Sequence, residues 1–270
     1  MEQTRRVVRT NDGVDISCTV FPGAEPAAVI LHGLAGSGGE FVRTAQALSG
    51  RKVVLIDQRG HGLSTRLPAD TSREAFVRDI VAVIDREASM PVHLIGHSMG
   101  AHTAMLAAAA HPDLVRTLVL LESDEGGGTP QEHEELLKYF RSWPTPFTDR
   151  AGASAFLGDG PLQRAWIDDL DEREDGLYPR FDADVMFAAI SAVAMPRWKE
   201  WSRVQAPTLV VYADGGMFTE EQKARFLSRG RDVRRVDIPG ASHDAHLDAF
   251  EQWSDAVTRF LDEVQGTTLT

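Results

Sequence analysis

The stretch Pro91-Val-His-Leu-Ile-Gly-His-Ser-Met-Gly-Ala-His-Thr-Ala-Met-Leu106 decides the fold of this chain of 270 residues. A short apolar run meets Gly96-His-Ser98-Met-Gly100, and an Ala-rich helical pattern follows at once. This is G-x-S-x-G between a strand and a helix, the context of a nucleophile elbow. So sharp a turn strains its central residue and requires glycine on either side. The pattern predicts a nucleophilic Ser98, against the alternative of a plain tight turn built from small residues.

Composition limits the class of protein. The length and the 43% hydrophobic content predict one large α/β domain with an insertion, or at most two domains. The net charge of −12 disfavours nucleic acid and anionic membrane surfaces as partners. The single Cys18, expected to be a small core residue, excludes an internal disulfide framework and fits a reducing compartment.

No targeting or membrane segment is predicted. The first residues, Met-Glu-Gln-Thr-Arg-Arg, lead into polar alternation without the apolar region of a signal peptide. No apolar run reaches the roughly 18 residues that a membrane-spanning helix needs. We therefore expect a cytoplasmic monomer or homodimer that acts on a small molecule, with no membrane partner.

Strand and helix patterns alternate along the first half of the chain. A hairpin is predicted over 3–21 with its turn at Asn11-Asp-Gly13. Such alternation at short spacing predicts a mainly parallel sheet covered by helices on both faces. The expected strands are 27–33, 52–57, 92–95 and 115–121, and the expected helices are 40–48, 72–88 and 99–110.

The Gly-rich loop after the strand 27–33 has two interpretations. A phosphate-binding loop would need a Lys after the glycines, and G-x-G-x-x-G fails because Phe41 occupies the place of the last glycine. Asp57, about 20 residues on, nevertheless mimics the ribose-binding acid of a dinucleotide site. In the competing interpretation, the backbone N–H of Leu34 points at a developing oxyanion.

The pattern breaks over residues 129–200, which are richer in charge and aromatic side chains. Helical segments near 130–142, 161–170 and 182–194 predict a helical cap over residues 125–204, with the core formed by 1–124 and 205–270. We expect apolar cap residues to pack the cap onto the core, and some to line a pocket. They are Phe140, Trp143, Phe147, Phe156, Trp166, Phe187, Met195 and Trp198.

The sheet pattern then resumes, with strands over 207–213 and 233–239 and helices over 219–228 and up to about 264. The tail 265–270 is expected to fray. Several phrases now stand in a recognisable order, and over residues 10–264 the chain resembles the α/β-hydrolase fold superfamily. They are Leu31-His-Gly-Leu34, Asp57-Gln-Arg-Gly-His-Gly62, Gly96-His-Ser-Met-Gly100, Pro207-Thr-Leu-Val210 and Gly240-Ala-Ser-His243. The resemblance implies an α/β-hydrolase fold with a helical cap insertion.

A serine nucleophile needs a base near neutral pKa, which points to histidine. His243 lies in a Gly-bounded loop after the last strand, where the motif places the base, and His246 is the alternative. Three other histidines, His61, His97 and His102, are expected to have structural roles.

The acid that orients the histidine has three candidates. Aligning on Pro207-Thr-Leu-Val210 puts Gly216 where the resembled family usually carries its Asp, with Asp214 two positions early. The other place is directly after the strand 115–121, where Glu122 stands, as in some superfamily members including haloalkane dehalogenases. Glu122 is preferred because its longer side chain can reach across from the adjacent strand, and Asp214 and Asp124 are the alternatives.

The backbone N–H groups of Met99 and Leu34 are expected to form the oxyanion hole, with no cofactor and no metal. These residues predict a serine hydrolase that cleaves an ester or lactone of a small, mainly apolar molecule through an acyl-enzyme. Two alternatives stay open: a low-turnover ligand-binding or sensor protein on the same scaffold, and a cofactor-free oxygenase or perhydrolase.

Overall fold

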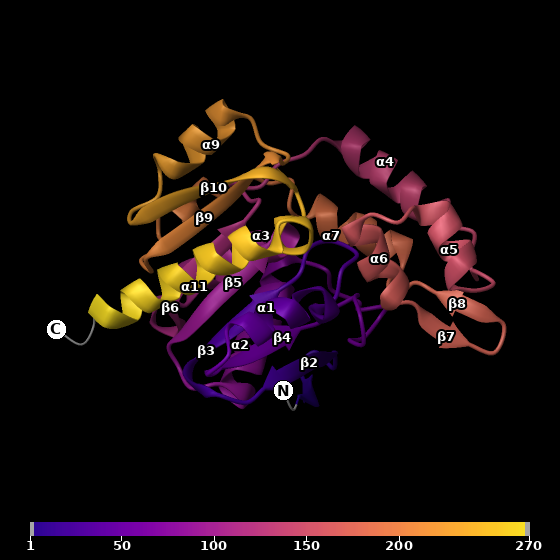
Figure 1. Ribbon diagram of the computed structural model, residues 1–270, viewed down its shortest axis with the longest axis horizontal. Coiled ribbons are helices and arrows are strands. Elements are labelled where there is room, and N and C mark those ends of the chain that lie inside the picture. The colour runs from indigo at the N-terminus through magenta and orange to yellow at the C-terminus, as the bar shows by residue number, and fades with distance from the viewer. Residues whose placement is uncertain (1–2, 268–270) are drawn as a thin grey trace.

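A twisted eight-stranded sheet organises the computed structural model, which describes residues 3–267 (Figure 1). Its order is β1-β2-β4-β3-β5-β6-β9-β10. Strand β2 runs antiparallel to β1 and β4, and the other neighbours are parallel. The strands are β1 (Thr4–Arg9), β2 (Asp15–Phe21), β3 (Ala24–Leu31), β4 (Arg51–Ile56), β5 (Val92–His97), β6 (Val115–Leu121), β9 (Thr208–Gly215) and β10 (Val233–Ser242).

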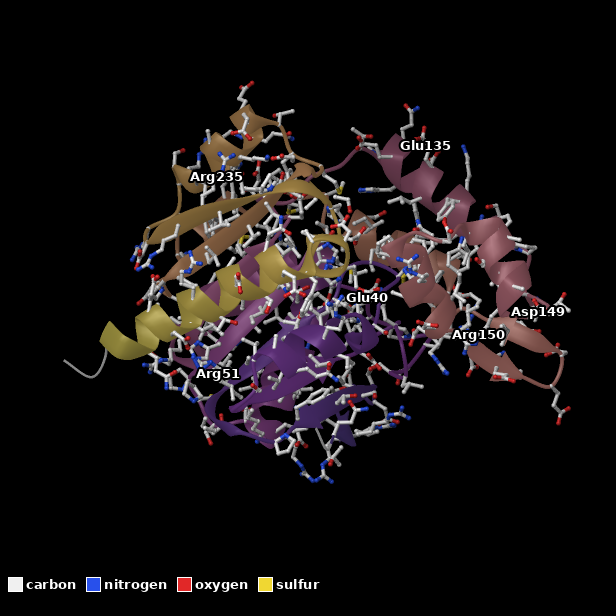
Figure 2. All side chains as sticks on the ribbon, viewed as in Figure 1. Glu40, Arg51, Glu135, Asp149, Arg150 and Arg235 are labelled. Atoms are coloured by element: carbon white, nitrogen blue, oxygen red, sulfur yellow. The ribbon has the colours of Figure 1, made fainter. Side chains whose placement is uncertain are left out.

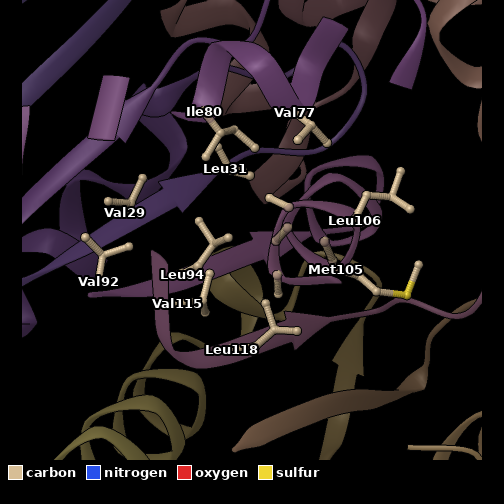
Figure 3. Packing of buried hydrophobic residues seen from close by; sticks show 14 of the residues in the cluster. Val29, Leu31, Val77, Ile80, Val92, Leu94, Met105, Leu106, Val115 and Leu118 are labelled. Atoms are coloured by element: carbon tan, nitrogen blue, oxygen red, sulfur yellow. The ribbon is translucent and has the colours of Figure 1, made fainter. Parts of the chain in front are cut away.

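Helices cover both faces of this sheet, because its central strands are apolar on both sides. Along β6, Leu118 and Leu120 belong to one buried cluster, whereas Val119 and Leu121 belong to another. Helices α2 (Arg73–Glu87), α3 (Met99–Ala110), α8 (Trp198–Trp201) and α9 (Glu220–Leu227) contribute to the first cluster, and Figure 3 shows part of it. The second is covered by η1 (Gly38–Phe41), α1 (Val42–Ala47), α10 (Ala245–Asp248) and α11 (Phe250–Thr267).

The expected mostly parallel sheet with helices on both faces is confirmed. In the core, the ends of several elements differ and a short 3-10 turn was not expected. Strand β3 stops at Leu31, so Gly33 already lies in the loop, and the 3-10 turn η2 (Pro112–Leu114) precedes β6. Helix α11 continues to Thr267, beyond the expected end near 264, and residues 268–270 of the tail lie outside the described residues.

Between β6 and β9 the chain forms the segment predicted as a cap, seen in salmon tones in Figure 1. Three features of this segment were not predicted, namely helix α5, the hairpin β7–β8 and helix α8, because all are short and the hairpin is polar. The elements are α4 (Pro130–Arg141), α5 (Arg150–Leu157), α6 (Pro161–Asp168), β7 (Asp171–Arg173), β8 (Gly176–Tyr178) and α7 (Ala183–Ser191), followed by α8.

The cap has a small core of its own. Phe140, Trp143 and Phe147 are buried there against Leu157, Ile167 and other cap residues. Ala35, from the loop after β3, joins the same cluster, so the cap core rests on that loop. Phe156 and Met195 are exposed. Among the helices of the described residues, none is both long and apolar enough to cross a membrane.

Trp253 tests the packing of α11 on the sheet. Its side chain is fully buried, and its Nε1 donates to Thr44 Oγ1 at 3.0 Å. We expect Trp253→Ala to lower the free energy of unfolding by about 3–5 kcal/mol, measured by urea denaturation, because it leaves a cavity and an unpaired hydroxyl. The control is Glu251→Ala on the same helix, where the side chain is 85% exposed and a change within about 0.5 kcal/mol is expected.

Candidate active site

Ser98 occupies the sharp turn between β5 and α3. Its φ of 51° and ψ of −119° place it in a conformation that non-glycine residues rarely adopt. Both flanking glycines are required. A methyl group at Gly96 would lie 2.5 Å from the Cα of Ala101, and one at Gly100 would lie 2.4 Å from the carbonyl oxygen of His32. The turn therefore needs glycine at both positions for the steric reason expected from the sequence.

Glu122 is the first residue after β6, and its carboxylate is held by three groups. Oε1 accepts the N–H of Ala213 at 2.8 Å, and Oε2 accepts the N–H of Met217 at 2.8 Å. Oε2 also lies 3.3 Å from Nδ1 of His243. The side chain is completely buried. The glutamate thus spans from the end of β6 to the loop after β9 and reaches the histidine after β10.

Gly216 leaves the space that this carboxylate fills. A methyl group at position 216 would lie 2.3 Å from Oε1 and 2.4 Å from Oε2 of Glu122. Any side chain at position 216 is therefore incompatible with the observed place of the Glu122 carboxylate. The missing Asp and the unusual Glu, noted separately in the sequence, are two sides of one arrangement.

His97 fixes the backbone of His243, in addition to the contact of Glu122 with its ring. Nε2 of His97 donates to the carbonyl oxygen of His243 at 3.0 Å, and the two rings lie 4.7 Å apart. Burial holds the pKa of His97 well below its usual range, so the ring is neutral and its one proton serves this bond. His97, expected to be structural, fixes the backbone of the loop that carries His243.

His246, the alternative base, lies in a closed compartment instead. It begins the turn of α10, stacks on Phe41 with ring centres 4.3 Å apart, and is 1% exposed. Its Nε2 lies 3.6 Å from Glu40, which lies in the interior close to α10 (Figure 2). It does not line the cavity described below.

His32 connects the loop after β3 to the loop after β4 by hydrogen bonds. Its Nε2 accepts the N–H of Gln58 at 3.0 Å, and its carbonyl oxygen accepts Nε2–H of Gln58 at 2.7 Å. Asp57 accepts the N–H groups of Gly38 and Leu63. Asp57 thus holds two turns together, which is the role of a structural carboxylate and not of a ribose ligand.

The two residues expected to form an oxyanion hole lie together. Met99 and Leu34 pack in one small apolar cluster with Phe76 and Val193. Met99 is the first residue of α3, where a backbone N–H has no acceptor within the helix. Among the described residues, three other than glycine have positive φ. They are Ala35, Ser98 and Glu122, in the loops that follow β3, β5 and β6.

Ser98, Glu122 and His243 all line a cavity of about 750 Å³. Glu135, which is exposed on α4 (Figure 2), also lines it. None of the eight cap residues named from the sequence lines it. The apolar lining comes instead from Met99, Leu136, Tyr139, Ile190, Val193, Pro196, Met217 and Phe218.

Among the described residues, none of the other candidate acids and histidines forms a hydrogen bond with His243. Asp214 is exposed and accepts the N–H of Gly240 at 3.2 Å, and Asp124 accepts the N–H of Gly126 at 2.9 Å. His61 is buried and bonds the carbonyl oxygen of Arg59. His102 lines the cavity but is 2% exposed, and neither of its ring nitrogens has a hydrogen-bond partner.

Two features of the site escaped the sequence interpretation. Tyr139 and Phe218 line the cavity, and no local pattern distinguishes them from other aromatic residues. Arg73, in the first turn of α2, donates to the carbonyl oxygen of Met99 at 3.2 Å. A basic residue at the positive N-terminal end of a helix is unfavourable. That unfavourable placement was the signal in the sequence that could have singled out Arg73.

This fold, with a serine on the elbow after β5, a carboxylate after β6 and a histidine after β10, defines an α/β hydrolase. The family model described as the alpha/beta hydrolase fold matches residues 26–250, and the chain belongs to this family.

Named relatives cover nearly all of the chain. The mouse (Mus musculus) sn-1-specific diacylglycerol lipase ABHD11 is 31% identical over 252 residues, covering 87% of this chain and 81% of the mouse one. The 2-(acetamidomethylene)succinate hydrolase of Mesorhizobium japonicum is 27% identical over 257 residues, 89% of either chain. A crystal structure of E-2-(acetamidomethylene)succinate hydrolase has a TM-score of 0.87 at 23% identity, covering 97% of this chain and 100% of that one, which shows the shared fold.

Glu40 provides a test of the compartment behind His243. Burial raises the pKa of this carboxyl from 4.5 to about 8. Between these two pH values the unfolded chain releases a proton that the folded chain keeps, so the folded state loses stability as pH rises. We expect Glu40→Gln, which cannot ionise, to become progressively more stable than the wild type from pH 5 to pH 8. Urea denaturation midpoints measure this difference, and a difference independent of pH would contradict a protonated Glu40.

Proposed function

We propose that the protein is a serine hydrolase that cleaves an ester or lactone of a small, mainly apolar molecule through an acyl-enzyme. Ser98 is the nucleophile, His243 the base and Glu122 the acid. The observation that carries this proposal is the Glu122 carboxylate, buried against Nδ1 of His243 in the space left by Gly216. A buried carboxylate in this position holds the tautomer whose free Nε2 can take a proton from serine.

The reaction follows from these roles. Ser98 Oγ attacks the carbonyl carbon while its proton passes to Nε2 of His243, and the carbonyl oxygen becomes an oxyanion. The N–H groups of Met99 and Leu34 stabilise that charge, and each such donor is worth about 2.7–4 kcal/mol. The tetrahedral intermediate then expels the alcohol, which takes the proton from His243. A water molecule then gives a proton to His243 and attacks the acyl-enzyme. The carboxylic acid product leaves, and the proton returns to Ser98.

The size and lining of the cavity support the proposed substrate class. About 750 Å³ lies within the range of small-molecule sites, and most of the surface of the cavity as a whole is apolar. The mouse relative is named a lipase, which is an ester-cleaving class. We therefore propose esters and lactones ahead of amides and carbon–carbon bonds.

Ser98→Ala tests the nucleophile. The wild type is expected to hydrolyse p-nitrophenyl butyrate and to be labelled by a fluorophosphonate, and the variant to lose at least about 10³-fold in kcat and all labelling. Circular dichroism and the urea midpoint control for folding. Equal rates in a folded variant would sink the assignment, and a wild type that neither turns over nor becomes labelled would favour a binding or sensor role.

Glu122 and Gly216 test the acid together. We expect Glu122→Gln to lower kcat by at least about 10²-fold, because the amide no longer stabilises the imidazolium. Gly216→Ala should lower kcat by a similar order, because the methyl group displaces the carboxylate.

Two comparisons serve as controls. Asp214→Asn removes the alternative acid and should leave kcat within about two-fold. Gly152→Ala places a methyl 3.5 Å from its nearest neighbour in α5, an ordinary contact, and should also have little effect. Loss of activity in Asp214→Asn alone would transfer the role of acid to that residue.

A further inference from the structure

Arg73 is a buried cation without a buried anion to balance it. The residue is 1% exposed, and its Nε and Nη1 have no hydrogen-bond partner. Among the described residues no ion pair joins Arg73 to a carboxylate, and the adjacent Glu74 is exposed and pairs with Arg197 instead. Removing a guanidinium from water without a counter-ion costs several kcal/mol, so its retention calls for an explanation.

The surroundings of Arg73 increase this cost. It lies in the first turn of α2, where the helix dipole is positive, and its Nη2 bonds the first turn of α3, where the dipole is positive again. The charge of Arg197 adds to the cost, and the charge of the adjacent Glu74 offsets part of it. Burial, followed by the charge of Arg197, lowers the pKa of Arg73 to about 9, so the side chain stays protonated at pH 7.

The bonds of Arg73 place this charge directly behind the elbow. Nη2 donates to the carbonyl oxygen of Met99 at 3.2 Å and to the hydroxyl of Thr103. Met99 is the residue whose N–H was assigned to the oxyanion hole. The guanidinium also stacks on Phe76, 4.4 Å from the ring centre, and Phe76 contacts Met99 in the same cluster. The cation is therefore held at fixed orientation beside one of the two donors.

The positive potential extends to the cavity. Burial first, and then the charges of Arg73 and Arg197, hold the pKa of His102 well below its usual range. His102 and Met99 both line the cavity. Arg73 thus places a positive charge on the side of Met99 and His102. Five carboxylates line the rest of the cavity, namely Glu122, Asp124, Glu125, Glu132 and Glu135. At Met99 itself, the charge of Arg73 favours negative charge that develops next to the serine.

We propose that Arg73 is a positioning residue of the oxyanion hole: it holds Met99 through the carbonyl oxygen of that residue, and its positive charge, which has no ion-pair partner among the described residues, stabilises the anionic transition state. This inference rests on the proposed function. The group that balances Arg73 is the oxyanion itself, which exists only while the tetrahedral intermediate forms. The residue therefore contributes to the rate at the expense of the resting fold.

If Arg73 has this role, its replacement lowers activity without lowering stability. If Arg73 were only a packing residue, its replacement would lower stability. Replacing an unpaired buried charge by an apolar side chain of similar volume is neutral or stabilising. We expect Arg73→Met to keep or raise the urea midpoint and to keep KM for p-nitrophenyl butyrate within about two-fold, while kcat falls about ten-fold. The rate constant for fluorophosphonate labelling should fall by a similar factor. Arg73→Lys, which keeps the charge, should restore most of kcat.

Arg59 supplies the matched control. It is equally buried, but Asp79 pairs with it at 2.6 Å and Asp12 at 3.0 Å. Arg59→Met leaves Asp79 uncompensated, so we expect the opposite result: a lower urea midpoint, with kcat of the folded fraction within about two-fold of the wild type.

The outcomes distinguish the two proposals. Wild-type turnover that is lost in Ser98→Ala but kept in Arg73→Met would overturn this inference alone. So would an Arg73→Met variant that unfolds or changes only KM, or an Arg73→Lys variant no better than Arg73→Met. If the wild type neither turns over the ester nor reacts with the fluorophosphonate, the proposed function fails and this inference fails with it.

Discussion

The site depends on how the carboxylate of Glu122 is held at the edge of the sheet. Parallel strands end side by side, so a residue just beyond β6 lies next to the loop after β9. One backbone N–H from the end of β9, one from the loop after it and the ring of His243 then surround the glutamate. This one side chain connects three segments that are far apart in sequence, and the absence of a side chain at Gly216 makes the connection possible. Water is excluded from it, which makes its electrostatic effect on the histidine larger.

Strain and unbalanced charge are concentrated at the same edge. Ala35, Ser98 and Glu122 all adopt positive φ, in the loops after β3, β5 and β6. Arg73 adds a cation behind the elbow that has no ion-pair partner in the described part of the chain. By contrast, β6 presents apolar residues to both faces of the sheet, and Arg59 pairs with two carboxylates. The stable sheet thus supports a local arrangement that is unfavourable by itself, which is typical of sites where the geometry serves a reaction.

Much of this could be predicted from the sequence where local rules act. The glycines around Ser98 specify their turn sterically, and the apolar runs specify the strands, so the α/β hydrolase fold followed. Glu122 was preferred over Asp214 through side-chain reach, but the collision at Gly216 depends on the register between β6 and β9, which no local pattern records. The cap was harder, since Phe140 packs inside it while the adjacent Tyr139 of the same helix lines the cavity. Helical spacing alone does not tell these faces apart when both are aromatic.

The contact between Gly216 and Glu122 also limits how related chains can change. A carboxylate carried at position 216 would occupy the space of the one carried at 122, and the two charges would repel within a buried volume. The positions therefore form an exclusive pair, in which one holds the acid and the other must stay empty. Moving the acid from the end of β6 to the loop after β9 therefore requires a change at both positions, and neither change alone gives a well-placed carboxylate.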